Sequence, residues 1–347
     1  MSSKAILYLN LCRLSCMALA HSSYRANKYG IFYIAIEHNC IDVVKYLIKN
    51  IDINLPNTVT LKGREYYYTP LMIASKFNRC KIIEILLNNG ANIDYQMPRW
   101  LYTALHIAVK NNNITAVTIL LSRGAKVDIK NSDGYTALHK AVIYRRRREI
   151  IKLLLSYNAD IGIRVSQNKG YTPFDIVNQC YDYNTLELLT SHIIRLDKSN
   201  SKNRLSDGFK HNKEMIKKSR ILKDIEKKCI VDMNKMKRVI IKKRYTLFDS
   251  FVNNNLNLIA NYKRRNELKS IADELCIYKG LYNDFIDSCI LRANLLHRSM
   301  NLIDNLYSKY YNNTKASWNN LPHEIKNDIL TYLNNDELRR VSETSLL

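Results

Sequence analysis

Two histidines in equivalent surroundings are the residues of this 347-residue chain best suited to chemistry. His106 and His139 each stand three residues after a threonine, Thr103 or Thr136. An imidazole can transfer protons near neutral pH or bind zinc, but both tasks need further groups around it. The sequence holds no Ser/His/Asp set, glycine-rich phosphate loop or reactive-cysteine signature. We therefore predict no catalytic residue, no metal and no cofactor, and a protein that is not an enzyme.

The cysteines indicate free thiols and not a metal site. Eight of them are scattered along the chain, and none forms a Cys-x-x-Cys pair. Cys12 and Cys16 share a helix face, but no His or Cys cluster completes a zinc site. We expect reduced thiols in a cytosolic protein. The sequence has no uncharged apolar run of about 18 residues, so we expect no membrane-spanning helix and no membrane partner.

The first residues have two interpretations. Residues 4–20 resemble a secretory signal with an Ala-x-Ala cleavage site, but Asn10 and Arg13 interrupt the apolar stretch. We favour an N-terminal capping segment over residues 1–28, because the terminal unit of a repeat array needs a modified outer face.

The two histidine motifs belong to a pattern that returns about every 34 residues. Thr69-Pro70-Leu71-Met72-Ile73-Ala74 precedes them, and each copy is followed 17 or 18 residues later by Ala91, Ala125 or Ala159. A fixed period of this length predicts a solenoid of stacked units, and such solenoids serve mainly in binding.

Each copy predicts two short antiparallel helices. The threonine caps the first helix through its hydroxyl, Pro70 suits a first helical turn, and the small alanines let neighbouring helices approach closely. Gly90 and Gly124 stand where a helix ends in a left-handed residue, and Asn158 takes that place in the last full copy. The predicted scaffold residues are Thr69, Pro70, Leu71, Ala74, Gly90, Thr103, Leu105, His106, Ala108, Gly124, Thr136, Leu138, His139 and Ala141.

These motifs resemble the ankyrin repeat family, whose signature is T-P-L-H-x-A. The resemblance is specific from Gly63 to Asp160, and weaker copies precede and follow it, which gives about five repeats over residues 29–195. It implies that His106 and His139 are packed, hydrogen-bonded residues of a helix start. It also implies a protein partner held by the concave face and by four variable loops: Pro56–Tyr68, Tyr95–Tyr102, Lys130–Tyr135 and Ser166–Tyr171.

The net charge of +23 is concentrated in one segment. From Lys202 to Arg244 there are 16 Lys or Arg and 5 Asp or Glu. We interpret residues 196–245 as a basic helical linker. A nuclear-import or acidic-partner patch fits this charge, and so does a composition biased toward AT-rich codons. No motif supports direct sequence-specific DNA binding, so we do not expect a nucleic-acid partner.

Beyond the linker, apolar spacing predicts helices over 213–244, 247–269, 271–277 and 281–306. The last 31 residues differ from these. A proline-started helix over 321–333 is followed by a second short helix that Asn335 can cap. This run resembles the start of an F-box, whose mark is L-P-x-E-I, and it is truncated because a full F-box continues for about one more helix.

Ankyrin repeats followed by such a tail resemble the poxvirus ankyrin proteins with a C-terminal PRANC domain. The resemblance implies an all-α fold: an ankyrin-repeat solenoid, then an α-helical region over 246–347 that ends in a truncated F-box-like helical pair at 317–347. It implies a viral substrate-recruiting adaptor that binds a host protein and docks the Skp adaptor of a cullin-based ubiquitin ligase, promoting ubiquitination or modulating host defence. The implied Skp-binding residues are Trp318, Leu321, Pro322, Ile325, Ile329, Leu330 and Leu333.

Two alternatives stay open at this point. The repeats alone can sequester a host signalling protein, with the tail as a purely structural cap, or the basic segment can serve a nuclear scaffold. Deletion of Ser317–Leu347 separates the first alternative from recruitment, and salt-dependent DNA binding tests the second. We expect the host cytoplasm as the location, with the nucleus left open.

Overall fold

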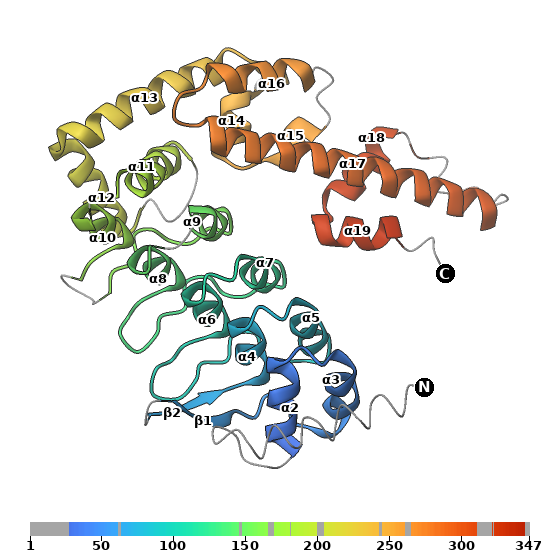
Figure 1. Ribbon diagram of the computed structural model, residues 1–347. Helices are drawn as coiled ribbons and strands as arrows, with labels where there is room; N and C mark the ends of the chain where they lie inside the picture. The colour runs from blue at the N-terminus through green and yellow to red at the C-terminus, as the bar shows by residue number, and fades with distance from the viewer. Residues whose placement is uncertain are drawn as a thin grey trace. The chain divides into compact units, whose positions relative to one another are not determined.

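A computed structural model describes residues 28–61, 64–145, 148–165, 170–180, 182–199, 205–242, 245–260, 265–310, 321 and 323–343. It confirms the predicted all-α architecture: a stack of helix pairs followed by a helical C-terminal region (Figure 1). The chain forms two compact units, one of residues 1–189 with 203–214 and the other of residues 190–202 with 215–347.

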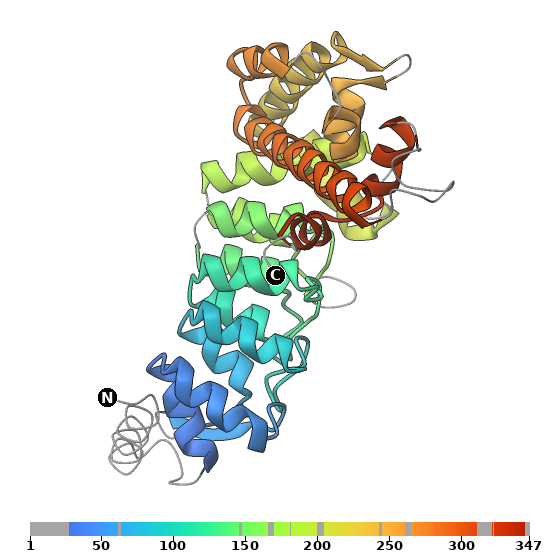
Figure 2. The same cartoon turned by 90° about the vertical axis from the view of Figure 1, so that its right-hand side faces the viewer.

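The first unit is a stack of two-helix repeats. Its first helices are α2 (Lys28–Glu37), α4 (Pro70–Lys76), α6 (Ala104–Lys110), α8 (Ala137–Ile143) and α10 (Pro173–Cys180). Its second helices are α3 (Ile41–Leu47), α5 (Cys80–Asn88), α7 (Ile114–Ser122), α9 (Arg148–Ser156) and the start of α11 (Tyr183–Asp197). Each first helix contacts the first helix of the next repeat, and α3, α5, α7 and α9 form a second row (Figure 2).

Left-handed residues separate the helices of this stack. Asn39, Asn78 and Asn112 have φ of 60°, 55° and 61° between the two helices of their repeats. Gly90 and Gly124 adopt φ of 87° and 86° after the second helix, a conformation in which a Cβ would be strained. The asparagine turns reverse the chain within three residues, and the glycines end the second helices before the loops that lead to the next repeat.

The insertion between the first two repeats forms an antiparallel hairpin. Strand β1 (Asn57–Leu61) pairs with β2 (Arg64–Tyr68), with Asn57 opposite Tyr68. The prediction of a loop over Pro56–Tyr68 was therefore wrong for these strands. The short helix η1 (Ile48–Asn50) precedes the hairpin. Strand β2 ends at Tyr68, directly before Thr69, the residue that caps α4.

The second unit is built around a long helix. Its elements after α12 (Asp207–Lys218) are α13 (Arg220–Lys237), β3 (Ile240–Lys242), β4 (Tyr245–Thr246), α14 (Leu247–Val252), α15 (Leu256–Ala260), α16 (Arg265–Glu274), α17 (Lys279–Tyr310), α18 (His323–Thr331) and α19 (Asn335–Glu343). Phe251 packs against the rings of Tyr278, Tyr282 and Phe285, and these four residues are at most 5% exposed. The buried carboxylate of Asp232 accepts backbone N–H groups that precede α17.

Two of the helix predictions in this region were wrong in their boundaries. The helix predicted over 213–244 breaks at Ser219, whose hydroxyl accepts the Leu222 N–H and starts α13. It also ends early, because residues 240–242 form strand β3, which pairs with β4. The helix predicted over 247–269 is divided at Asn254, which has φ of 52°. The segment interpreted as a linker contributes buried side chains of α13 to the second unit: Leu222, Ile225, Cys229, Met233 and Met236.

Candidate functional site

Each histidine motif forms a bracket, a threonine hydrogen-bonded to the residue three positions later, at the start of α6 and of α8. Thr103 has extended backbone angles, and its Oγ1 accepts the His106 N–H. In return, His106 Nδ1 accepts the Thr103 N–H at 3.2 Å and lies 2.9 Å from Thr103 Oγ1. This reciprocal pair is a capping box, with histidine in the place that glutamate usually takes.

The same histidine joins one repeat to the next. His106 Nε2 lies 3.2 Å from the Tyr135 carbonyl oxygen, and His139 Nε2 lies 3.3 Å from that of Tyr171. Because Nδ1 accepts a backbone N–H, the proton of the neutral ring sits on Nε2 and is donated to that carbonyl. The histidines therefore hold the register between repeats.

Burial governs the ionisation of both rings. It lowers the pKa of His106 and of His139 to about 4, and the hydrogen bonds to the Tyr135 and Tyr171 carbonyls oppose this shift. The two residues are 1% and 0% exposed, so a substrate cannot reach either ring. The remaining scaffold threonines, leucines and alanines are 3% exposed or less, and Pro70 is also buried.

Carboxylates take the place of histidine in two further brackets, which were not predicted from the sequence. Thr172 donates its N–H to Asp175 Oδ2 at 2.8 Å, and Asp175 Oδ1 lies 2.9 Å from His211 Nε2. In the second unit, Thr246 and Asp249 close the same box at 2.7 Å. A search for Thr followed three residues later by either His or an acid finds all of these positions.

The variable loops of the first unit are tied to each other. Gln96 donates to the Lys130 carbonyl oxygen at 2.9 Å, and Lys130 Nζ donates to the Arg164 carbonyl oxygen at 3.0 Å. The Ser132 N–H donates to the Trp100 carbonyl oxygen at 3.0 Å. Neighbouring loops are thus held together, which reduces the ordering cost of binding a partner. Residues 166–169 of the fourth loop lie outside the described residues.

The C-terminal helical pair packs on α17. Leu330 of α18 and Leu338 of α19 are buried at 2% and 0%, and Leu333 packs against the same cluster. The α17 side of this cluster is made of Ala293, Leu295, Leu296, Met300 and Ile303. Lys326 of α18 also forms an ion pair with Asp304 of α17 at 2.8 Å.

Arg292 fastens the turn between α18 and α19 to α17. It is 6% exposed and donates to the Thr331 and Leu333 carbonyl oxygens at 2.8 and 2.7 Å. Its Nη1 donates to Asn335 Oδ1 at 2.9 Å, and its Nε donates to Asn257 Oδ1. These bonds satisfy carbonyls that the end of α18 leaves without helical partners.

The cap of α19 is Asn334, so the prediction of Asn335 was wrong. Asn334 Oδ1 accepts the Glu337 N–H at 2.9 Å, and Glu337 accepts the Asn334 N–H at 2.7 Å. Asn335 is instead engaged by Arg292. Asn334 therefore caps α19, whereas Asn335 accepts a hydrogen bond from Arg292.

The predicted Skp-binding residues divide between two sides of α18. Leu330 and Leu333 face α17, whereas Leu321, Ile325 and Ile329 are 36%, 45% and 45% exposed. The structure adds Tyr332, which is 91% exposed and was not among the predicted residues. We call the residues Leu321, Ile325, Ile329 and Tyr332 the exposed stripe. Trp318 and Pro322 lie outside the described residues.

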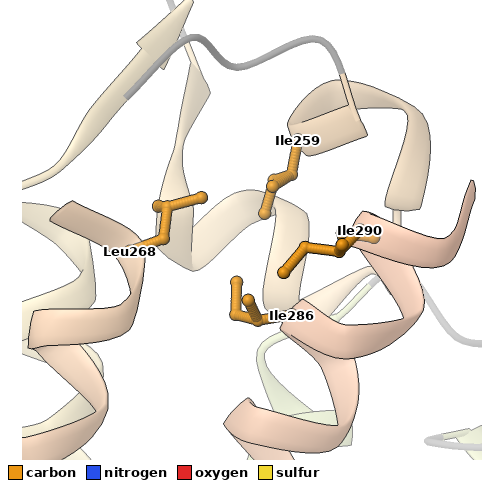
Figure 3. Close-up of a pocket in the computed structure, with 5 residues that line it drawn as sticks. Ile259, Leu268, Ile286 and Ile290 are labelled. Atoms are coloured by element: carbon orange, nitrogen blue, oxygen red, sulfur yellow. The ribbon is translucent and has the colours of Figure 1, made fainter. Parts of the chain in front are cut away.

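A small apolar pocket in the second unit lies between α15, α16 and α17 (Figure 3). Ile259, Leu268, Ile286 and Ile290 point into it, and Cys289 completes the lining. Its volume of about 10 Å³ is no more than one water-sized sphere occupies. Burial also raises the pKa of Cys289 to about 12, so its thiol is unreactive at neutral pH. The pocket is a gap in packing and not a ligand site.

Two searches over the described ranges concern other kinds of site. Among these residues, no three His, Cys, Asp or Glu side chains gather closely enough to hold a metal ion. Within the same ranges, no helix has the length and apolar character needed to cross a bilayer.

Comparisons with known proteins agree with this division of the chain. The family description "Ankyrin repeats" matches residues 8–97, 71–165 and 105–201, and the PRANC domain matches residues 242–343. The chain is 43% identical over 336 residues to ankyrin repeat protein FPV031 of fowlpox virus (strain NVSL), covering 95% of this chain and 97% of that protein.

Two further relatives are longer than this chain. It is 28% identical over 303 residues to ankyrin repeat protein FPV024 of the same virus, which covers 84% of this chain and 43% of that protein. It is also 28% identical over 216 residues to ankyrin repeat domain-containing protein OPG023 of cowpox virus (strain Brighton Red), covering 56% of this chain and 30% of that protein.

Fold and comparisons together define a protein built from two protein-interaction modules, ankyrin repeats and a PRANC domain. The chain belongs to the poxvirus ankyrin repeat proteins that carry a C-terminal, F-box-like PRANC domain.

Proposed function

We propose that this protein recruits a host protein to a ubiquitin ligase. The ankyrin unit binds the host protein through its loops and concave face. The exposed stripe of α18 docks a Skp-type adaptor of a cullin-based ligase, which brings the captured protein to ubiquitination or otherwise alters host defence. The host cytoplasm is the proposed site of action, with the nucleus as a second compartment.

The observation that carries this proposal is the exposed stripe itself. Ile325 and Ile329 are four residues apart on α18, the spacing of one helix face, and Leu321 and Tyr332 flank the helix on either side. All four large side chains are accessible. The opposite side of α18 is already packed on α17. A helix with a second, exposed apolar face suits docking into a groove of a partner.

The alternative is a stoichiometric blocker whose tail is only a structural cap. The burial of Leu330 and Leu338 favours a cap-like contribution. However, a cap does not require the exposure of Ile325 and Ile329 on the other side. The two readings of the tail therefore differ in the role of the exposed stripe, and substitutions there separate them.

We expect the double substitution Ile325→Glu and Ile329→Glu to weaken binding of the purified Skp-type adaptor at least thirtyfold, corresponding to roughly 2 kcal/mol for buried anchors of an interface. Both side chains are solvent-exposed in the free protein, so the fold is expected to tolerate the change. Titration calorimetry of the full chain with the adaptor measures the effect.

Val231→Glu is the matched control, because Val231 is 54% exposed on α13 of the same unit. Adaptor binding that persists in the double variant, or is lost equally in the control, contradicts docking through the stripe. Deletion of residues 317–347 is a poorer test, since it uncovers the apolar side of α17 as well. Point substitutions leave that side covered.

A further inference from the structure

A tyrosine precedes the capping threonine in four successive repeats: Tyr68, Tyr102, Tyr135 and Tyr171. Lysines lie over three of these rings. Lys76 Nζ is 5.6 Å from the centre of the Tyr68 ring, Lys110 Nζ is 5.7 Å from that of Tyr102, and Lys140 Nζ is 4.4 Å from that of Tyr135. We call these six residues, Lys76, Lys110, Lys140, Tyr68, Tyr102 and Tyr135, the lysine–tyrosine row.

The row is continuous across repeats. Lys140 Nζ also lies 5.5 Å from the centre of the Tyr102 ring, so Lys110 and Lys140 converge on one tyrosine. The lysines belong to α4, α6 and α8, which contact one another in that order. Ammonium groups from three repeats therefore gather along one edge of the first helices.

Lys140 is the most unusual member of this group. It occupies the motif position that Ile73 and Ile107 fill in the two preceding repeats, where they are 0% and 4% exposed. Lys140 is 6% exposed, and Asp133 lies 3.9 Å from its Nζ with a half-exposed side chain. An ammonium group in an apolar position destabilises a fold unless its partners compensate for lost water. Such residues are common where a binding surface has been selected over stability.

The charges in the row also act on each other. Partial burial lowers the pKa of Lys110, and the positive charges of Lys140 and Lys76 lower it further. Burial likewise lowers the pKa of Lys76, while the charge of Glu37 opposes the shift. An incoming anion would relieve this repulsion among partly desolvated ammonium groups.

We propose that the lysine–tyrosine row is the docking surface for an acidic segment of the protein partner. This inference rests on the proposed function, because it specifies the chemistry of the protein that the ankyrin unit holds. Neighbouring helices lie about 8–10 Å apart, and a polyproline II segment advances about 3.1 Å per residue with three residues per turn. Acidic groups three residues apart on such a partner segment share one face and therefore match lysines on successive repeats.

A single-stranded nucleic acid is the competing occupant, since it also uses cations and aromatic rings. Base stacking needs a free ring face. Here the ammonium groups lie over the rings, and Tyr68 is only 7% exposed. The row therefore favours carboxylates or phosphates carried by a peptide.

Replacement of Lys140 by isoleucine is expected to leave the fold intact and to raise Tm by roughly 2–4 °C, because it restores the residue of the two preceding repeats. Thermal unfolding followed by circular dichroism measures this shift. A lower Tm would show that Lys140 stabilises the fold, and would remove the argument from its unusual position.

Selection of random peptides displayed on phage tests the proposal directly. The full-length protein is compared with the triple variant Lys76→Gln, Lys110→Gln and Lys140→Ile. We expect peptides enriched in Asp and Glu at intervals of about three residues with the native protein, and no such enrichment with the variant. Acidic peptides selected equally by both proteins, or selected peptides without acidic residues, overturn the proposal.

Fluorescence polarisation of the strongest peptide then measures affinity. We expect binding at least tenfold weaker to the triple variant, and at least tenfold weaker for a peptide with Gln and Asn in place of Glu and Asp. Phosphoserine at the acidic positions distinguishes phosphate from carboxylate recognition. Displacement of the peptide by oligothymidylate overturns the choice of a protein segment. The adaptor titration uses a different surface, so the two proposals fail separately.

Discussion

Acidification from pH 7 to pH 4 is expected to remove roughly 3 kcal/mol of unfolding free energy for each of His106 and His139. The pKa of both rings is lowered to about 4 in the folded protein, against about 6.5 in an unfolded chain. Above pH 6.5 both states are neutral, and the brackets contribute fully. As pH falls below 6.5, the unfolded chain binds protons that the folded rings do not, so stability declines until about pH 4.

Carboxyl groups of the same unit change the folding stability in the opposite direction as pH falls. Burial raises the pKa of Asp128 to about 6 and also raises that of Asp160. Both carboxyl groups bind protons in the folded state before they do so in the unfolded chain, so they add stability as pH falls. For Asp128 this gain begins near pH 6. The pH profile of the native protein alone is a sum of both effects, and a variant is needed to isolate the histidines.

The double variant His106→Gln and His139→Gln supplies that comparison. Glutamine can still accept the N–H of Thr103 or Thr136 in a capping box, but it does not titrate. We expect the variant to be less stable at pH 7 and the difference from the native protein to shrink toward pH 4. A difference that stays constant over this range contradicts the assignment.

Urea unfolding can be followed in the ankyrin unit alone. The chain contains two tryptophans, Trp100 in this unit and Trp318 near the C-terminus. In a Trp318→Phe background, the fluorescence of Trp100 reports the first unit. The same background is used for the native and glutamine forms.

The ankyrin brackets could be predicted from sequence because every part of them is local. A threonine, a histidine three residues later and a glycine after the second helix fix caps and turns within one repeat. Contacts between side chains of neighbouring repeats could not be predicted from the sequence. Lys140 occupies a position that varies in the motif, and its burial becomes clear only when the stacked tyrosines are in place.

The tail was harder to predict for a physical reason. Helix α18 is apolar on two sides, and the spacing of Ile325, Ile329 and Leu330 does not distinguish them. Helix α17 ends at Tyr310, well before α18 begins at His323. Only the packing of α18 on α17 decides that Leu330 is buried and Ile329 is exposed. In the same contact, Arg292 donates a hydrogen bond to Asn335 Oδ1, and the side chain of Asn334 caps α19 instead.

Replacement of Arg292 by methionine is expected to cost roughly 3–5 kcal/mol in the packing of α18 and α19 on α17. The substitution removes all four hydrogen bonds that the guanidinium donates, and it leaves the Thr331 and Leu333 carbonyl oxygens without this partner. Hydrogen exchange of residues 323–343 measures the loss of protection. Arg298→Met on the exposed side of α17 is the matched control.

Lysine at position 292 is expected to give an intermediate result. It keeps the charge, but an ammonium group cannot reproduce the planar fork that reaches both carbonyls and the two asparagines. Native-like protection in Arg292→Met would contradict the role assigned to this residue.

The Arg292 and Ile329 substitutions together separate the packing of α18 on α17 from the binding of α18 to the Skp-type adaptor. If the Skp-type adaptor binds the helix as presented by α17, Arg292→Met weakens binding in proportion to the detached population, because only the packed state has the competent geometry. Ile329→Glu should weaken binding without any loss of exchange protection, since its side chain is 45% exposed. Unchanged adaptor affinity in Arg292→Met, with protection lost, would mean that α18 binds as a free helix. In that case adaptor binding would not depend on α17, and Leu330 would be released to contact the adaptor.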